Sequence, residues 1–249
     1  MRRIKLWIQY DGTDYAGWQV QENATGIQNV IEEALFVLTG ERIRLTGAGR
    51  TDKGVHALGQ VAHFDTNSRI PGDKWHYQLK PILPDAIRVI GSAETDLSFH
   101  ARFSAQKKRY RYTIFTEAIR PPMYRHFTAH VNRLDTEAME DAIPLFLGKH
   151  DYRAFMSSGS PVPNTCRTLD KLTLTRNGAL LHLDFEAESF LYNQVRIITG
   201  TLVAIGLGRM QPAQAKRALD EGIRRLAGPT MPPQGLTLME VLYDGEEER

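Results

Sequence analysis

The sequence predicts an α+β fold, because segments with strand and helix periodicity follow one another in the same order twice along its 249 residues. In each half the order is strand, helix, strand, strand, helix, strand, which is the succession of a ferredoxin-like unit. No Gly/Ser-rich linker separates the halves, so we expect the two units to pack closely. We therefore predict two domains, residues 1–103 and residues 104–249.

In the first half, strands are predicted over residues 3–10, 42–46, 59–65 and 87–93. The first helix follows Thr25 and Gln28, which have the spacing of a capping box. Its apolar residues recur at helical spacing, and Gly40 is a natural stop. A weaker helix is predicted over residues 73–79.

In the second half, strands are predicted over residues 110–116, 128–132, 169–175, 180–187 and 238–243, and helices over residues 190–205 and 212–221. Asn177 and Gly178 form a strong hairpin signal between two of these strands. Asp135 or Thr136 is expected to cap a further helix, which Pro144 must kink or end early. The acidic run at residues 246–248 reads as a solvated tail.

The composition is that of a globular protein, with 42% hydrophobic and 24% charged residues. Cys166 is the only cysteine, which excludes an intrachain disulfide and fits a reducing compartment. No long apolar core follows Met1, and no uninterrupted apolar run reaches the ~20 residues of a membrane span. We therefore predict a cytoplasmic protein with neither a signal peptide nor a membrane partner.

Basic and aromatic residues are concentrated in one stretch, although the net charge is only +2. Between Arg102 and Arg133 there are eight Lys/Arg residues and a single acid, Glu117, with six aromatic residues among them. Cations neutralise phosphates and aromatic faces stack on bases, so the mixture suits RNA. A strand with a solvated basic face would show the same charge pattern, and charge alone does not decide between the two.

Two short motifs suggest other chemistry and are rejected. Asp11-Gly12-Thr13 resembles part of an aspartyl-phosphatase signature, but Gln9 stands where the nucleophilic carboxylate would be required. Gly47-Ala48-Gly49 starts like a dinucleotide fingerprint, but Asp52 occupies the third glycine position and no helix follows.

A metal site is not predicted either. His56 and His63 lie seven residues apart, on a predicted loop and a predicted strand, and no third ligand accompanies them.

The polar loop at residues 49–57, GRTDKGVHA, is the strongest candidate site. It lies between two predicted strands, and loops held by rigid strands often carry catalytic residues. Asp52 stands beside Arg50, and Gly49 and Gly54 allow a tight turn. An aspartate that only caps its own turn would give the same pattern, so both interpretations stay open at this point.

This loop closely resembles the catalytic loop of the TruA family of tRNA pseudouridine synthases. Three further blocks resemble the same family in the same order: YDGTDYAGWQVQ at residues 10–21, FHARFSAQKKRYRY at residues 99–112 and FLYNQVRIITG at residues 190–200. The departures are minor. Lys53 stands where many bacterial members carry Ala, and Gln194 where Met is frequent.

The resemblance implies conversion of uridine to pseudouridine at positions 38 to 40 of the anticodon stem-loop of tRNA. It implies a homodimer, and it implies two ferredoxin-like units packed side by side into one extended antiparallel sheet, with helices on one face and the catalytic cleft between the units. A non-catalytic RNA-binding protein on the same scaffold is the main alternative, since fold alone does not settle function. Such a protein would have no use for the GRTD loop.

Four residues acquire roles from the resemblance. Asp52 aligns with the essential aspartate, and Arg196 with an arginine that pairs with that carboxylate. Tyr110 aligns with a tyrosine that packs against the target base, and Arg50 with a loop arginine that holds the RNA backbone or helps to splay the target nucleotide. Tyr110 and Tyr112 point the same way on a strand, so one of the two can be a core residue.

The implied reaction breaks the N1–C1′ bond, turns the uracil and rejoins it through C5. It requires neither cofactor nor metal. It requires an ionised carboxylate, which either attacks covalently or removes a proton. A neighbouring guanidinium opposes protonation of a desolvated carboxylate, which is the effect expected of Arg196.

Overall fold

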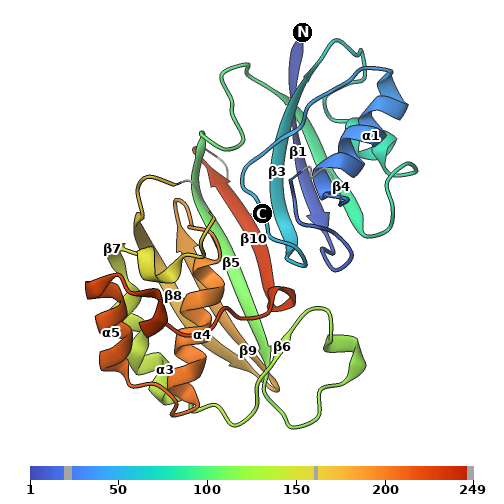
Figure 1. Ribbon diagram of the computed structural model, residues 1–249. Coiled ribbons are helices and arrows are strands. Elements are labelled where there is room, and N and C mark those ends of the chain that lie inside the picture. Colours follow the sequence, from blue (N-terminus) through green and yellow to red (C-terminus); the bar gives the residue numbers. More distant parts are fainter. Residues whose placement is uncertain (20–23, 160–161, 246–249) are drawn as a thin grey trace. The chain divides into compact units, whose positions relative to one another are not determined.

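The computed structural model describes residues 1–19, 24–159 and 162–245. Val20 and Gln21 of the N-terminal block, and the predicted acidic tail at residues 246–248, lie outside the described residues. The chain divides into two compact units (Figure 1). Unit 1 comprises Met1–Gln106 with Thr237–Arg249, and unit 2 comprises Lys107–Leu236.

The described residues of unit 1 form a mainly antiparallel sheet and the α-helices α1 and α2. Its elements are β1 (Arg2–Tyr10), α1 (Ile27–Thr39), β2 (Thr46–Gly47), β3 (His56–Thr66), α2 (Trp75–Leu79), β4 (Ile87–Thr95) and most of β10 (Leu236–Tyr243). The central strand β1 pairs antiparallel with β3 and with β4. On its other side β3 pairs antiparallel with β2 and, near its start, parallel with β10. The order β4-β1-β3-β2 matches the ferredoxin-like succession predicted for this half.

The core of unit 1 follows from the two periodicities of the sequence. Ile4, Leu6 and Ile8 alternate along β1 and are fully buried. Ile31 and Leu35 lie four residues apart on α1 and are also fully buried. Figure 1 shows α1 lying against the strands of this unit.

The start of α1 differs from the prediction. The N-cap is Gly26, whose backbone N–H donates to Asn29 Oδ1 over 3.1 Å. The predicted capping box of Thr25 and Gln28 is therefore wrong, because Gln28 is used elsewhere. Its amide donates to Glu32 and to the carbonyl of Leu45. The predicted stop is confirmed, since Gly40 adopts φ 72° at the C-cap.

The strand predicted over residues 42–46 is mostly absent, and only Thr46–Gly47 is paired. The side chains of α1 explain the difference. Gln28 Nε2 donates to Leu45 O over 3.0 Å, and Leu45 N–H donates to Glu32 Oε1 over 2.9 Å. The backbone polar groups of Leu45 are thereby satisfied by a helix instead of by a neighbouring strand.

The described residues of unit 2 form an antiparallel sheet and the α-helices α3, α4 and α5. Its elements are β5 (Ala105–Phe115), β6 (Ala129–His130), α3 (Thr136–Ala142), β7 (Gly148–Asp151), β8 (Cys166–Asn177), β9 (Leu180–Ala187), α4 (Gln194–Gly206) and α5 (Pro212–Glu221). The strands β5, β9, β8 and β7 lie in that order with antiparallel pairing, and β6 pairs parallel with the end of β5. Figure 1 shows α3, α4 and α5 gathered on one side of β8 and β9.

Three predicted features of unit 2 are confirmed with small shifts. Asp135 caps α3 by accepting from the backbone N–H of Ala138 over 3.0 Å. The helix ends at Ala142, and Pro144 follows in a 3-10 segment. The hairpin forms between β8 and β9, but Asn177 pairs with Leu180, so the two loop residues are those at positions 178 and 179.

The helix predicted over residues 190–205 begins later, at Gln194. Its buried side chain accepts the backbone N–H of Leu191 over 2.8 Å. Asn193 adopts φ 62°, a left-handed conformation that interrupts a helix. The helix over residues 212–221 is confirmed to the residue.

The predicted α+β class is confirmed, with antiparallel sheets in both units. The sequence interpretation placed all residues after 103 in the second domain, whereas residues from Thr237 onward cluster with unit 1. They do so because Thr237 and Leu238 pair with His56 and Ala57 of β3. No helix among the described residues has the length and apolar character needed to traverse a bilayer.

Candidate active site

Asp52 opens a tight turn between β2 and β3. The backbone N–H of Val55 donates to the carbonyl of Asp52 over 3.1 Å, and Gly54 adopts φ 77° within the turn. This conformation favours glycine over any residue with a Cβ. The Asp52 side chain is half-buried, while Lys53 beside it is exposed. The turn thus orients one carboxylate on a fixed backbone.

A second loop, residues 11–18, packs against this turn and is hydrogen-bonded to it. Trp18 N–H donates to Thr51 O over 3.0 Å, and Gly54 N–H donates to Tyr15 O over 3.4 Å. The two backbones approach so closely at Gly12 that a Cβ there would lie 2.0 Å from the carbonyl oxygen of Val55.

Gly17 is the second point of close approach. A Cβ at this position would lie 2.4 Å from Thr51 O and 3.0 Å from the carbonyl carbon of Asp52, and its φ is 97°. Glycine at positions 12 and 17 is therefore a steric requirement of the loop that carries Asp52. The sequence places Gly12 and Gly17 in the block YDGTDYAGWQVQ but predicts no role for either residue. Two glycines five residues apart in one short loop are the sequence signal that points to a close approach between backbones.

Buried side chains hold the loop on both sides of Arg50. Tyr10 Oη and Thr51 Oγ1 are hydrogen-bonded over 2.8 Å, and Gln60 Nε2 donates to Gly49 O over 2.9 Å. Burial raises the pKa of Tyr10 well above its ordinary value, so the phenol stays protonated. These contacts restrain the backbone from which Asp52 projects.

The DGT motif forms a turn. Asp11 Oδ1 accepts from the backbone N–H and the hydroxyl of Thr13, over 3.0 and 2.5 Å. His56 Nδ1 accepts the N–H of Gly12 over 3.1 Å and lies 3.2 Å from Asp11 Oδ1. Within the part of the chain that the structure describes, no group of three or more His, Cys, Asp or Glu residues is placed to hold a metal ion.

Arg50 projects from the same loop as Asp52 and is exposed. Its guanidinium makes no hydrogen bond or ion pair with any other described residue. A cation in this position is accessible to an anion in solution.

Tyr110 lies on β5 of unit 2, opposite Phe185 of β9. Its ring is largely buried and meets Phe190 edge to face, with centroids 5.2 Å apart. Tyr112 is fully buried, and its hydroxyl donates to Pro232 O over 2.6 Å. Both rings are therefore buried, and Tyr112 is the more completely enclosed of the two.

Arg196 lies in the first turn of α4 and is held at both ends of its guanidinium. Its Nε donates to Met231 O over 2.7 Å, and its Nη1 donates to Asn193 Oδ1 over 2.5 Å. Asn193 is itself held, because its Nδ2 donates to Ser157 Oγ over 2.8 Å. These bonds leave the side chain of Arg196 little freedom.

The segment at residues 228–232 lies directly against α4. The backbone N–H of Met231 donates to Arg196 O over 3.2 Å. A Cβ at Gly200 would lie 1.8 Å from Pro229 O, so glycine is required there. This approach brings the carbonyl of Met231 to Arg196, a contact that sequence reasoning missed because 35 residues separate the two.

The structure brings Asp52 and Arg50 together on one loop of unit 1. It places Tyr110 and Arg196 in unit 2, on a strand and on a helix respectively. The backbone that carries each of these four side chains is held by hydrogen bonds of a turn, a strand or a helix.

The four blocks and this geometry agree with the comparison against protein families. The family model described as tRNA pseudouridine synthase matches residues 6–104 and 142–244. The chain belongs to the tRNA pseudouridine synthase family, and it is an isomerase that acts on tRNA. Catalysis is thereby favoured over the alternative of a non-catalytic RNA-binding protein.

Relatives named tRNA pseudouridine synthase A match nearly the whole chain. That of Acetivibrio thermocellus is 48% identical over 98% of this chain and 100% of its own length. Those of Pelobacter propionicus and Thermoanaerobacter sp. strain X514 are 45% and 44% identical, with the same coverage. A chain of a solved Cbf5-Nop10-Gar1 complex aligns at 12% identity and a TM-score of 0.40, over 94% of this chain and 48% of that one, a similarity too low to support a conclusion.

Proposed function

We propose that this enzyme isomerises uridine to pseudouridine at positions 38 to 40 of the anticodon stem-loop of tRNA, with Asp52 as its catalytic carboxylate. The observation that carries the proposal is the environment of Asp52. The carboxylate is half-buried on a turn whose backbone is restrained by Tyr15, Trp18 and Gln60. A restrained carboxylate can be presented to a ribose or a base with little loss of conformational freedom.

The chemistry needs one such group. The N1–C1′ bond breaks, the uracil turns, and a C5–C1′ bond forms. The proton on C5 is lost to solvent and N1 gains one, so no electron donor or acceptor takes part. Asp52 either attacks ribose C1′ as a nucleophile or removes a proton from the ribose, and both routes use the ionised carboxylate.

We propose that Arg196 pairs with this carboxylate when RNA is bound. A guanidinium stabilises a carboxylate that binding removes from water, and its two parallel N–H groups match the two oxygens. The bonds from Arg196 to Met231 and Asn193 support this role, because they fix the direction of the side chain.

Tyr110 and Arg50 are proposed to hold the target nucleotide. Extruding a base from its stack costs a few kcal/mol, and stacking on an aromatic face returns ~1–3 kcal/mol. We propose that the Tyr110 ring, which is largely buried in the free protein, provides such a face when RNA is bound, and its edge-to-face contact with Phe190 supports the ring orientation. Exposed Arg50 suits a phosphate of the displaced strand.

We further propose that the enzyme works as a homodimer in the cytoplasm. The single cysteine, Cys166, is exposed and free, which suits a reducing compartment.

Substitution of Asp52 by Asn tests the proposal. The amide keeps the size of the side chain but cannot act as nucleophile or base, so we expect tRNA affinity within about twofold and turnover reduced by at least about 10³-fold. Release of tritium from C5-labelled uridine in tRNA measures turnover. Asp14→Asn, which removes an exposed carboxylate of the supporting loop, is the matched control. Substantial tritium release by Asp52→Asn would remove Asp52 from the mechanism.

A second arm of the same assay uses Arg196→Lys. Lysine keeps the charge but loses the fork, so we expect the single-turnover rate to fall more than the affinity for tRNA. A change in affinity alone would contradict the pairing role.

A further inference from the structure

We propose that residues 97–104 of unit 1 form a second RNA contact, in which Phe103 stacks on an unpaired base of tRNA and Arg102 binds an adjoining phosphate. This inference rests on the proposed function. The segment lies away from Asp52. Its Ala101 donates a hydrogen bond to His63, which comes eleven residues after Asp52 and seven residues after the start of β3 at His56. At ~3.3 Å per strand residue, the two places are about 20 Å apart along the sheet.

Phe103 is presented to solvent as a flat aromatic face. Its side chain is 75% exposed, although burial of a ring this large is normally favourable. The ring of His100 lies beside it, with centroids 4.3 Å apart and planes 32° from parallel. The guanidinium of Arg102 lies 5.5 Å from its centroid. Two neighbours thus orient an exposed ring without covering it.

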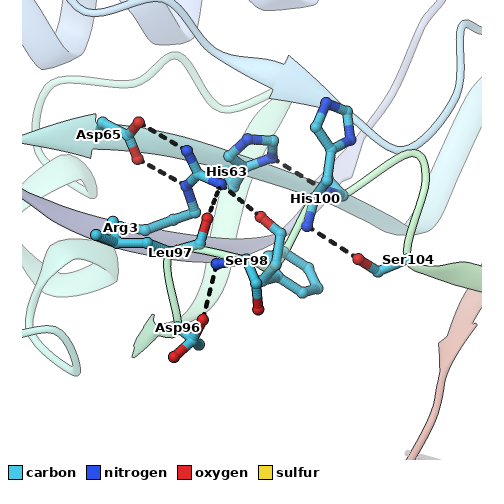
Figure 2. Close-up of polar contacts among 10 residues, drawn as sticks. Arg3, His63, Asp65, Asp96, Leu97, Ser98, His100 and Ser104 are labelled. Carbon is cyan, nitrogen blue, oxygen red and sulfur yellow. Dashed lines mark hydrogen bonds and ion pairs between the residues drawn. The ribbon is translucent and has the colours of Figure 1, made fainter.

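The segment is anchored to the sheet by Arg3, as Figure 2 shows. The guanidinium forms a fork with the Asp65 carboxylate over 2.7 and 2.8 Å. Its remaining nitrogen donates to Leu97 O over 2.6 Å and to Phe99 O over 2.8 Å. One arginine therefore ties the segment to β1 and to β3 at once.

Two histidines hold the other end of the segment. His63 Nδ1 accepts the N–H of Ala101 over 3.1 Å (Figure 2). His100 Nδ1 accepts the N–H groups of Arg102 and Phe103 over 3.1 and 3.2 Å. The backbone that carries Phe103 is thus fixed before any ligand arrives, and a preorganised surface loses little entropy on binding.

The two phenylalanines of the segment have opposite roles. Phe99 turns inward, where its ring lies 4.8 Å from the ammonium of buried Lys5 and 5.1 Å from the ring of Tyr243. Tyr243 also donates its hydroxyl to Ala101 O over 2.6 Å. Phe99 and Ala101 thus supply the contacts between the segment and the rest of unit 1, and Phe103 is not needed for the packing of the segment.

Charge complementarity identifies the occupant as RNA. No acidic residue stands between Asp96 and Glu117, while the same stretch carries Arg102. An exposed ring beside an exposed guanidinium that makes no ion pair with any described carboxylate combines the two interactions that single-stranded nucleic acid requires, stacking and phosphate neutralisation.

Phe103→Ala and Phe103→Trp test the contact in the full-length enzyme with full-length tRNA. Loss of one stacked base predicts that Phe103→Ala raises Kd by about 5- to 100-fold, while Phe103→Trp keeps Kd within about threefold of wild type. The single-turnover rate of tritium release at saturating enzyme should stay within about twofold, because the contact lies away from Asp52. Arg102→Ala should weaken binding and reduce the slope of log K against log salt by about one.

Tyr77→Ala is the matched control. Tyr77 is another exposed ring of unit 1, 62% exposed, with the His76 ring 3.9 Å away, but its neighbour Lys74 is paired with Asp73. We expect its Kd for tRNA to be unchanged.

Three outcomes overturn the proposal: an unchanged Kd for Phe103→Ala, an equal loss for Tyr77→Ala, or a changed oligomeric state of Phe103→Ala in sedimentation, which would assign Phe103 to a contact between two copies. Absence of tritium release by the wild-type enzyme would instead reject the proposed function.

Discussion

Histidines in unit 1 act as hydrogen-bond acceptors for the backbone of neighbouring loops. His56 Nδ1 accepts from Gly12 below the Asp52 turn, and His63 Nδ1 accepts from Ala101. An imidazole nitrogen that accepts a hydrogen bond carries no proton, so the bond from Ala101 requires His63 to be the neutral tautomer with its proton on Nε2. In the sequence, His56 and His63 lie seven residues apart without a third ligand, which predicts only that they hold no metal ion. Their actual partners lie on other loops.

His63 makes the stability of the protein depend on pH. Its burial and, secondarily, the positive charge of Arg3 lower its pKa from 6.5 to about 4. As the pH falls from 6.5 toward 4, the unfolded chain takes up a proton at this residue while the folded protein does not. The free energy of unfolding therefore falls with pH through this window, and above pH 6.5 the contribution is fully present.

We predict that His63→Asn reduces this dependence on pH. The Asn amide oxygen can still accept the N–H of Ala101, but the side chain does not titrate. Urea unfolding above pH 7 and near pH 5 measures the difference, which should be smaller in the variant than in the wild type. His130→Asn, at an exposed position, is the control. An unaltered difference in His63→Asn would show that the pH dependence arises elsewhere.

At the scale of elements, the loop that carries Asp52 and the loop at residues 11–18 behave as one structure. A Cβ atom at Gly12 would lie 2.0 Å from Val55 O, and one at Gly17 would lie 2.4 Å from Thr51 O. A side chain at either position must therefore displace the turn of Asp52. The family block around these glycines is therefore a structural support for the carboxylate.

Gly17→Ala should consequently impair catalysis more than its effect on folding explains. A left-handed residue with a Cβ costs about 1–2 kcal/mol by itself. Gly40→Ala isolates that cost, because Gly40 has φ 72° and no atom within 4 Å of a Cβ, whereas Gly17 has φ 97° and meets Thr51.

We expect Gly17→Ala to lose at least as much stability as Gly40→Ala in urea unfolding, because only its Cβ also meets the carbonyl oxygen of Thr51. Under conditions in which both variants are folded, only Gly17→Ala should lose about tenfold or more in the single-turnover rate, since a displacement of the order of 1 Å at reacting groups can cost about 10²-fold. Equal activity of the two variants would refute the supporting role.

Elements with strong local signals were predictable. The strand β1, the helix α5 and the cap of α3 at Asp135 follow from periodicity and capping chemistry, which act within a few residues. The strand expected over residues 42–46 did not form because Gln28 and Glu32 bond to Leu45 from a helix. No local pattern contains that information.

For the whole molecule, the least predictable feature is the position of β10. This C-terminal strand joins a unit whose other strands all come from the first 106 residues. Its parallel pairing with β3 joins residues Thr237 and Leu238 to residues about 180 positions earlier. A strand's own sequence does not encode the partner it selects.

We predict that Leu238→Ala destabilises unit 1. Leu238 is fully buried, and truncation of a buried leucine costs about 2–5 kcal/mol. Hydrogen exchange should show loss of protection in β3 greater than in β8 and β9. Val37→Ala removes an exposed apolar side chain and should change stability by no more than about 0.5 kcal/mol. Protection lost equally in β8 and β9 would argue against the assignment of β10 to unit 1.

The sequence by itself determined the α+β class, the order of most strands and helices, and the loop on which Asp52 lies, because these depend on periodicity, turn chemistry and short motifs. Only the tertiary structure decided the partner of β10, the close approach of Gly12 and Gly17 to the Asp52 turn, and the bond between Arg196 and Met231. These contacts join residues far apart in the chain, and their geometry depends on packing that no local stretch of sequence specifies.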